Sequence, residues 1–191
     1  MTGSPEPQPK LSAQTFKLPA LTFVVGGARS GKSRLAEGLV TGSGLPRHYI
    51  ATAEAWDDEM RARIARHQAD RGPDWTTWSA PRAVETVVAQ IPQGHVALLD
   101  CATLWLTNEL LSGADITARS QTLLNALTAC LAPVVVVSNE VGWGIVPENA
   151  LAREFRDHQG RLNQQIAARA DLVVGVMAGL PMVLKGVMPN A

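Results

Sequence analysis

The segment that follows the first apolar run of the chain has the residue types and spacing of a phosphate-binding loop. It matches the pattern G-x-x-x-x-G-K-S/T. Glycines let the backbone curl so that successive N–H groups point inward and bind an anion. In such a loop the lysine reaches the β- and γ-phosphates of a nucleotide, and the serine hydroxyl binds Mg²⁺. The residues of the predicted loop are Gly26, Gly27, Ala28, Arg29, Ser30, Gly31, Lys32 and Ser33.

A glycine-rich turn that binds nothing is the alternative interpretation. The loop, however, lies between a predicted strand at residues 21–25 and a helix that is predicted to begin at Ser33, which is the context a nucleotide site requires. The positive end of that helix adds to the attraction for phosphate. We therefore expect nucleotide binding here, with Lys32 as a catalytic residue and Ser33 as a metal ligand.

A second candidate is Asp100, which ends the apolar run 96–99. In P-loop proteins a carboxylate at the tip of a neighbouring strand commonly helps to hold Mg²⁺, whereas other strand-end aspartates only cap the next turn. Beside a P-loop we favour the role at the metal or the nucleotide. The residues after Asp100 are Cys-Ala-Thr, and those after the run 134–137 are Ser-Asn-Glu-Val. Neither matches the Asp-x-x-Gly or Asn-Lys-x-Asp signals of a regulatory GTPase, which argues against that class.

A histidine lies on a helix that is predicted over residues 57–68. Met60, Ile64 and His67 share one face of that helix. On the pattern alone, His67 is most simply the polar end of a buried stripe. A neutral imidazole can also attack phosphorus and hold a covalent intermediate. The spacing does not decide between these two roles.

Short apolar runs alternate with segments of helical period along the chain, which predicts an α/β fold with a mainly parallel sheet flanked by helices. The run of four valines at 134–137 is typical of a strand buried on both faces. The predicted strands are 21–25, 48–51, 96–99, 134–137 and 172–176, with an edge strand at 182–184. One predicted helix begins at residue 33. Further helices are predicted over residues 57–68, 81–89, 104–111, 116–131 and 149–168.

The composition of the chain excludes several classes of protein. The 191 residues carry 17 Lys and Arg against 17 Asp and Glu, so nothing favours a nucleic-acid or acidic-membrane partner. The two cysteines, Cys101 and Cys130, are too few for a disulfide scaffold, and buried free thiols fit a reducing cytoplasm. Three prolines within residues 1–18 and a fourth at Pro19 favour a flexible N-terminal extension over residues 1–18. Residues 19–191 form a single predicted domain, and its longest apolar run, 172–184, is too short to span a bilayer.

Several segments together resemble the bifunctional adenosylcobinamide kinase/adenosylcobinamide-phosphate guanylyltransferase family of cobalamin biosynthesis. They are 26–34 (GGARSGKSR), 49–53 (YIATA), 57–64 (DDEMRARI), His67 and 138–149 (SNEVGWGIVPEN). The match continues through Arg153, Phe155, Arg156, Asp157, Gly160, Arg161, Asn163 and Gln164. It covers about residues 21–186. The P-loop is generic, whereas the block 138–164 is specific.

The resemblance implies a role for each matching residue. It implies that His67 takes GMP from GTP as a phosphoramidate and that Gly26 to Ser33 bind the triphosphate with Mg²⁺, for GTP or ATP. Ser79 departs from the family, which often has a glutamate there, and this difference bears on nucleotide preference. Further residues that are implied to contact the nucleotide are Thr52, Ala53, Glu54, Gln68, Ala69, Asp70, Arg71 and Asp100.

The implied protein is a P-loop NTPase of the RecA-like type that phosphorylates adenosylcobinamide with ATP or GTP and then transfers GMP from GTP to give adenosylcobinamide-GDP. The implied partners are these small molecules, and neither nucleic acid nor a membrane is expected. The implied protein is cytoplasmic and forms a homo-oligomer such as a trimer. One alternative is a P-loop small-molecule kinase without nucleotidyl transfer, in which His67 is a core residue. The other is a nucleotide-binding protein without catalysis.

The loop at residues 140–148 follows a buried strand and is a candidate for the corrinoid side of the site. Trp143 offers a flat apolar surface to a corrinoid, or else it packs at an interface. Arg153, Arg156 and Arg161 are expected on a solvated or subunit-facing helix surface. Because one site cannot align the γ- and α-phosphates for two acceptors at once, we also expect the helix 57–68 to move, with Gly72 as a candidate hinge.

Overall fold

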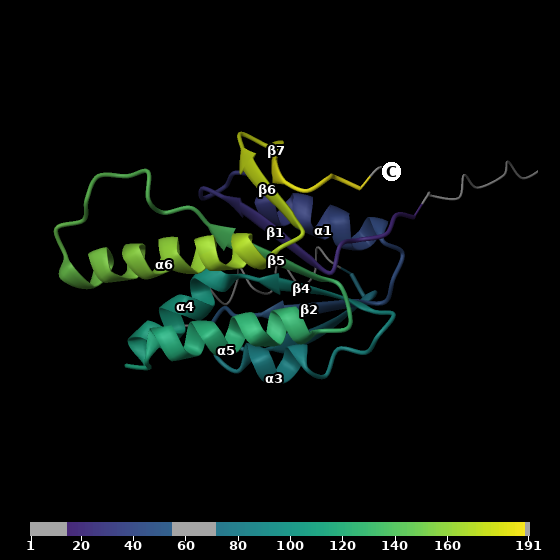
Figure 1. Cartoon of the computed structure of the whole chain (residues 1–191), viewed down its shortest axis with the longest axis horizontal. Coiled ribbons are helices and arrows are strands. Elements are labelled where there is room, and N and C mark those ends of the chain that lie inside the picture. The colour runs from purple at the N-terminus through teal and green to yellow at the C-terminus, as the bar shows by residue number, and fades with distance from the viewer. Residues whose placement is uncertain (1–14, 55–71, 190–191) are drawn as a thin grey trace, which may run out of the picture.

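Strands and helices alternate along residues 15–54 and 72–189, which are the residues that the computed structural model describes (Figure 1). The strands are β1 (Leu21–Gly26), β2 (Arg47–Ala51), β3 (Trp75–Ser79), β4 (Val96–Asp100), β5 (Val134–Asn139), β6 (Leu172–Met177) and β7 (Leu180–Lys185). The helices are α1 (Lys32–Gly42), α3 (Val84–Val88), α4 (Ala102–Leu111), α5 (Ile116–Ala129) and α6 (Ala150–Arg169). None of these helices is both long and apolar enough to cross a membrane.

The described strands form one seven-stranded sheet in the order β3-β2-β4-β5-β1-β6-β7. All neighbouring pairs are parallel except β6 and β7, which pair antiparallel. The predicted α/β fold with a mainly parallel sheet is therefore confirmed. The antiparallel β7 is the predicted edge strand.

Helices cover both faces of the sheet, which explains why its central strands are apolar throughout. On one face, α1 packs its Ala36, Leu39 and Val40 against alternate residues of β1, β4 and β5. On the other face, α3, α4, α5 and α6 pack against the remaining residues of the same strands (Figure 1). The four valines at 134–137 are fully buried, two in each core.

Parallel pairing in register brings the carboxyl ends of the central strands to one edge. Gly26 of β1 lies opposite Asn139 of β5, and Asp100 of β4 lies opposite Val137 of β5 and Ala51 of β2. The loops that follow these strands therefore meet at this edge. Ligands of open α/β sheets bind outside the carboxyl ends of the strands.

Two elements differ from the sequence prediction. β3 was not predicted, because Trp-Thr-Thr-Trp-Ser is a short edge strand whose residues are only half-buried or exposed and which carries no buried apolar run. The helix that was predicted over 81–89 forms only at α3, since Pro81 and Arg82 lie in the bend that precedes it. The predicted helix at 57–68 lies outside the described residues.

The described part of the predicted N-terminal extension packs on the domain. Leu18 is 3% exposed, and Phe16 donates its backbone N–H to the carbonyl of Gly42 at 3.2 Å. A side chain at Gly42 would collide with the Phe16 ring. Both cysteines are free, as predicted; Cys101 is buried, whereas Cys130 is only partly buried.

A histidine pair lies at the amino-terminal edge of the sheet, on β2 and just before β4. His48 Nε2 is 2.8 Å from His95 Nδ1, and the indole N–H of Trp78 donates to His48 Nδ1 at 2.9 Å. Because an indole nitrogen only donates, His48 is neutral with its proton on Nε2, which donates to His95. Burial, followed by the repulsion of His95, lowers the pKa of His48 below its ordinary value of 6.5.

We predict that the protein loses stability as the pH falls below about 6.5. The unfolded chain takes up a proton at His48 near that pH, whereas the folded protein resists it, so the free energy of unfolding decreases with falling pH. Each unit of pKa depression corresponds to about 1.4 kcal/mol. Urea unfolding between pH 7.5 and 5.5 measures the slope, and His48→Asn, which keeps an acceptor for Trp78, should reduce it. An unchanged slope in His48→Asn, compared with His158→Asn as control, would contradict the assignment.

Candidate active site

The loop between β1 and α1 has the backbone conformation of an anion-binding nest. Gly31, which immediately precedes α1, has φ 97°, and Arg29 has φ 56°. A Cβ at Gly26 would collide with the carbonyl of Val176 on β6, so only glycine fits there. The loop closes through Ser30, whose N–H donates to the Gly27 carbonyl at 3.3 Å. The sequence thus folds this segment as a tight turn onto a helix N-terminus.

The side chains inside this loop fit a bound phosphate. The ammonium group of Lys32 reaches back across the loop and donates to the Gly27 carbonyl at 3.1 Å. The hydroxyl of Ser30 is buried and has no hydrogen-bond partner among the described residues. A buried polar group without a partner is costly unless a ligand or water satisfies it. An anion held by the N–H groups, Lys32 and Ser30 would do so.

Asp100 is held at the same edge by the end of β2. The hydroxyl of Tyr49 donates to Asp100 Oδ2 at 2.9 Å. The hydroxyl of Thr52 accepts from the Cys101 N–H and donates to the Cys101 carbonyl, both at 2.8 Å. The backbone N–H of Thr52 donates to the Asp100 carbonyl at 3.2 Å. These bonds join the two strand ends and set the position of the Asp100 carboxylate.

Lys32 and Asp100 both lie close enough to Cys101 to influence its thiol. Burial, and then the negative charge of Asp100, raises the pKa of Cys101 to about 11, while Lys32 acts in the opposite direction. The thiol therefore remains protonated at neutral pH and is not a nucleophile. The charges of the loop lysine and of the β4 carboxylate thus act on the Cys101 thiol in opposite directions.

A buried polar network supports the end of β5 next to the loop. Ser138 donates to Asn163 Oδ1 at 2.7 Å and accepts from Gln159 Nε2 at 2.9 Å. The Asn163 amide then donates to the Asn139 carbonyl at 3.0 Å, and Thr103 accepts from the Asn139 N–H at 2.7 Å. The network joins α4 and α6 to the last residues of β5.

The next residue, Glu140, connects this network to the phosphate-binding loop. Its N–H donates to the Gly26 carbonyl at 3.1 Å, and its carboxylate accepts from the Gly142 N–H at 2.6 Å. Arg153 donates to the carbonyls of Pro147 and Glu148, which fixes the far end of the same loop on α6. The 140–148 segment, which we call the β5–α6 loop, is therefore anchored at both ends.

The structure brings part of the predicted site together. Residues 26–33, Thr52 and Asp100 lie along one edge, and Ala53 and Glu54 follow Thr52 there, half-buried. The sequence prediction missed Tyr49, which orients Asp100, and Asn108, whose amide donates to the carbonyls of Thr52 and Pro81. The sequence signals that could have found them are a polar hydroxyl in an otherwise apolar strand, for Tyr49, and a polar amide in an otherwise apolar helix, for Asn108. His67, Gln68, Ala69, Asp70 and Arg71 lie outside the described residues.

Ser33 and Asp100 are suited to a magnesium ion that travels with a nucleotide. The described residues contain no group of three or more His, Cys, Asp or Glu side chains that could hold a metal by themselves. Mg²⁺ at nucleotide sites needs no such group, since it takes one or two protein oxygens and completes its shell with phosphates and water. A hydroxyl and a carboxylate are ligands of this kind.

The strand–loop–helix and the position of Asp100 define a P-loop NTPase domain. Solved structures agree on the fold: the ATPase EscN of the enteropathogenic E. coli type III secretion system matches with a TM-score of 0.52 at 10% identity, over 84% of this chain and 43% of that one. Another type III secretion ATPase matches with a TM-score of 0.50 at 12% identity, over 90% of this chain and 59% of that one. Identities this low show the fold alone.

Sequence comparison identifies the family. The family model described as cobinamide kinase / cobinamide phosphate guanyltransferase matches residues 22–184. The bifunctional adenosylcobalamin biosynthesis protein CobP of Pseudomonas aeruginosa is 48% identical, over 86% of this chain and 96% of that protein. CobU of Escherichia coli K12 is 43% identical, over 86% of this chain and 99% of that protein. The chain belongs to this family, which confirms the predicted resemblance; a kinase without nucleotidyl transfer is not favoured.

We predict that Tyr49→Phe weakens the handling of Mg²⁺, because Asp100 loses the donor that orients it. The free energy of unfolding should fall by about 1 kcal/mol. The Mg²⁺ concentration for half-maximal phosphoryl transfer should rise several-fold. Trp75→Phe is the control, since the Trp75 ring packs edge-on against Tyr49 at 6.2 Å without touching this hydrogen bond. Equal Mg²⁺ dependence in the two variants would show that the bond does not matter.

Proposed function

We propose that the edge formed by the P-loop, Thr52 and Asp100 carries out both reactions that the family's description names. The description names a cobinamide kinase and a cobinamide phosphate guanyltransferase. For this protein we assign them to phosphorylation of adenosylcobinamide and to transfer of GMP from GTP to the phosphorylated product. The observation that carries the proposal is the P-loop itself, with a buried unpartnered Ser30 hydroxyl and Lys32 reaching across the loop. Residues 26–33 bind the triphosphate of GTP or ATP.

In the kinase reaction the hydroxyl oxygen of adenosylcobinamide attacks the γ-phosphorus and the hydroxyl proton passes to solvent. The bond from the γ-phosphorus to the β-bridging oxygen breaks, and the nucleoside diphosphate leaves with that electron pair. Lys32 and the N–H groups of the loop bind the non-bridging oxygens, where the charge is spread in the transition state. Mg²⁺ on Ser33 and Asp100 would neutralise further phosphate charge. Positioning and charge neutralisation supply most of such catalysis.

In the guanylyl reaction we assign the nucleophile to His67, on the matching motif and the family membership. Its imidazole attacks the α-phosphorus of GTP, a P–N bond forms and pyrophosphate leaves. The phosphate of the acceptor then attacks the same phosphorus, the P–N bond breaks, and the histidine is restored. Two displacements replace one direct reaction between two anions.

The corrinoid is assigned to the outer side of the P-loop. Trp143 is 78% exposed, and together with Gly27, Ala28 and Met182 it lines a cavity of about 590 Å³ beside the loop. Its wall is largely apolar and includes Met177 and Leu184. A large ring with methyl substituents would find apolar contact there, next to the transferred phosphate.

We also propose how copies of this protein assemble and in which compartment it works. Every residue of β7 is exposed, including Leu180, Met182, Val183 and Leu184, and such an apolar edge strand is suited to contact with further copies of the chain. A homo-oligomer, with a trimer as the form expected from the family resemblance, is the assembly we propose. Two free cysteines fit a reducing cytoplasm.

Labelled GTP tests the proposed function directly. With Mg²⁺ and GTP labelled in the α-phosphate, the wild-type protein should acquire acid-labile, alkali-stable label, as expected of a phosphoramidate. His67→Ala should acquire none, while it retains phosphorylation of adenosylcobinamide by ATP. Label from the γ-position should not remain on the protein. Wild-type protein without α-label would disprove the guanylyl half.

Lys32→Ala separates the roles of the P-loop. Because the P-loop lysine contacts the reacting phosphates in the transition state, phosphoryl transfer should fall by a factor of about 10² or more. Quench-flow measurement at saturating ATP detects this loss. Lys185→Ala, at a surface lysine that contacts the end of α6, is the matched control. A Lys32→Ala enzyme as fast as the control would exclude the P-loop as the kinase centre.

A further inference from the structure

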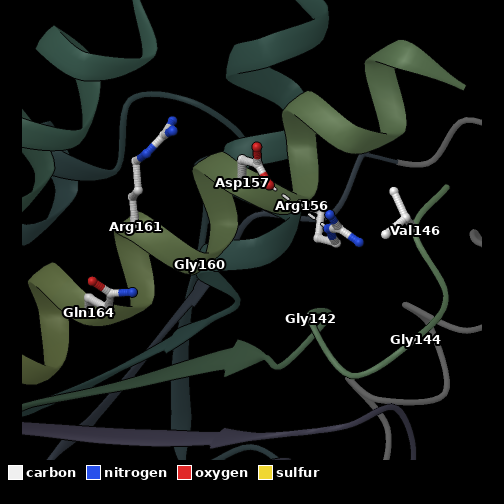
Figure 2. Close-up of a pocket in the computed structure, with 8 residues that line it drawn as sticks. All are labelled: Gly142, Gly144, Val146, Arg156, Asp157, Gly160, Arg161 and Gln164. Atoms are coloured by element: carbon white, nitrogen blue, oxygen red, sulfur yellow. Dashed lines mark ion pairs between the residues drawn. The ribbon is translucent and has the colours of Figure 1, made fainter.

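A cleft between the β5–α6 loop and α6 has features that the proposed function does not use. Its volume is about 570 Å³. The loop contributes Gly142, Gly144 and Val146, and the helix contributes Arg156, Gly160 and Arg161 (Figure 2). The cleft is open to solvent and lies one loop away from the phosphate-binding residues.

Two guanidinium groups give this cleft its positive charge. Arg161 makes no hydrogen bond or ion pair with any other residue in the described part of the chain, and its side chain is exposed. Arg156 Nε is 3.8 Å from Asp157 Oδ1, which is too far for a hydrogen bond. Figure 2 shows Arg156 on the side of the helix that faces Val146, and Arg161 extending from a later turn. Asp157, whose side chain is 57% exposed, is the acidic residue that lines the cleft.

Gly160 is an independent sign that something approaches this face closely. It lies inside the 20-residue helix α6, where glycine is less favourable than alanine. A Cβ added at Gly160 would meet no atom within 4 Å, so packing within the described chain does not require glycine. The added carbon would project into the cleft. A glycine that is costly for the helix and unnecessary for packing is expected where a ligand contacts the backbone.

The β5–α6 loop connects this cleft to the nucleotide site. Glu140, at the start of the loop, bonds to the Gly26 carbonyl of the P-loop and to the N–H of Gly142 in the cleft. In guanylyl transfer the acceptor's phosphate must lie against the α-phosphorus, whereas Lys32 and the P-loop bind the positions of the β- and γ-phosphates. An acceptor that carries a phosphate needs cations of its own.

We propose that the cleft binds the phosphomonoester group of the acceptor, adenosylcobinamide phosphate, through Arg156 and Arg161. The proposal rests on the proposed function, because it assigns the acceptor of its second reaction. Guanidinium forks bind phosphate oxygens with two parallel hydrogen bonds. Adenosylcobinamide has a hydroxyl where the phosphorylated acceptor has a dianion, so the arginines distinguish the product of the first reaction from its substrate.

Equilibrium dialysis without nucleotide tests the cleft apart from the catalytic steps, with the corrinoid followed by its visible absorbance. Wild-type protein should bind adenosylcobinamide phosphate more tightly than adenosylcobinamide. Arg156→Ala and Arg161→Ala should each weaken binding of the phosphorylated corrinoid about tenfold or more, the size expected of a charged hydrogen bond. Their affinity for adenosylcobinamide should change less than about threefold. Arg169→Ala, in the last turn of the same helix, should behave as wild type.

A chase experiment then tests whether the cleft binds the acceptor during GMP transfer. The enzyme is loaded with α-labelled GMP, freed of nucleotide, and mixed with increasing adenosylcobinamide phosphate. The two arginine variants should load normally and require about tenfold more acceptor for half-maximal release. Failure of the wild type to load would reject the proposed function, whereas the dialysis result would still decide the cleft.

Three outcomes would overturn the proposal. If the variants bind both corrinoids as the wild type does, the cleft does not hold the phosphate. If they load GMP as poorly as they release it, the arginines act on GTP. If they change the sedimentation coefficient without any phosphate-specific loss of affinity, the cleft is a contact between copies of the chain.

Gly160→Ala supplies a variant that we expect to stay folded, because the added Cβ meets no atom within 4 Å in the described residues. A helix-interior alanine should raise Tm by about 2–4 °C. The same methyl group occupies part of the cleft and should weaken binding of adenosylcobinamide phosphate several-fold. Gln165→Ala, on the exposed surface of α6, is the control. A stabilised Gly160→Ala protein with wild-type affinity would contradict close approach of the acceptor at this face.

Discussion

The parallel register of β1, β4 and β5 is the constraint on which the site depends. Because the three strands run in the same direction and pair residue by residue, Gly26, Asp100 and Asn139 must end at one edge of the sheet. Their side chains and loops then meet without any long connection. The apolar faces of these strands, buried under helices on both sides, hold the register, since a slip by one residue would exchange the two cores.

The strand register brings the ends of β4 and β5 to one edge, and buried hydrogen bonds then fix the positions of individual groups there. Thr52 holds both backbone groups of Cys101, and Ser138 holds two amide side chains of α6. Each buried polar group must keep its partner, because losing one costs about 1–3 kcal/mol. These networks lie at the ends of β4 and β5, directly beside the phosphate-binding loop. These two networks of buried polar groups therefore lie where the geometry of the loops matters most.

The sequence predicts the parts of this structure that follow from local patterns. The P-loop, the strand of valines at 134–137 and Asp100 at the end of β4 are each readable from a few neighbouring residues. The partners of Asp100 and Asn139 are not, because Tyr49 and Asn163 reach them only through tertiary packing. β3 was missed for a related reason: an edge strand of half-buried residues carries little hydrophobic signal. Hydrophobic periodicity indicates which residues are buried. It does not indicate which distant residues Tyr49 and Asn163 bond to, or that the half-buried residues of β3 pair with β2.

A chain without net charge can still bind two phosphate groups, because binding depends on where the cations lie. Lys32 lies within the P-loop, whereas Arg156 and Arg161 lie across the β5–α6 loop from it. Two anions that bind cations on opposite sides of one loop repel each other less than two anions at a single site. The short β5–α6 loop, which Glu140 and Arg153 anchor at its two ends, contributes residues to both cavities and is the element that separates them.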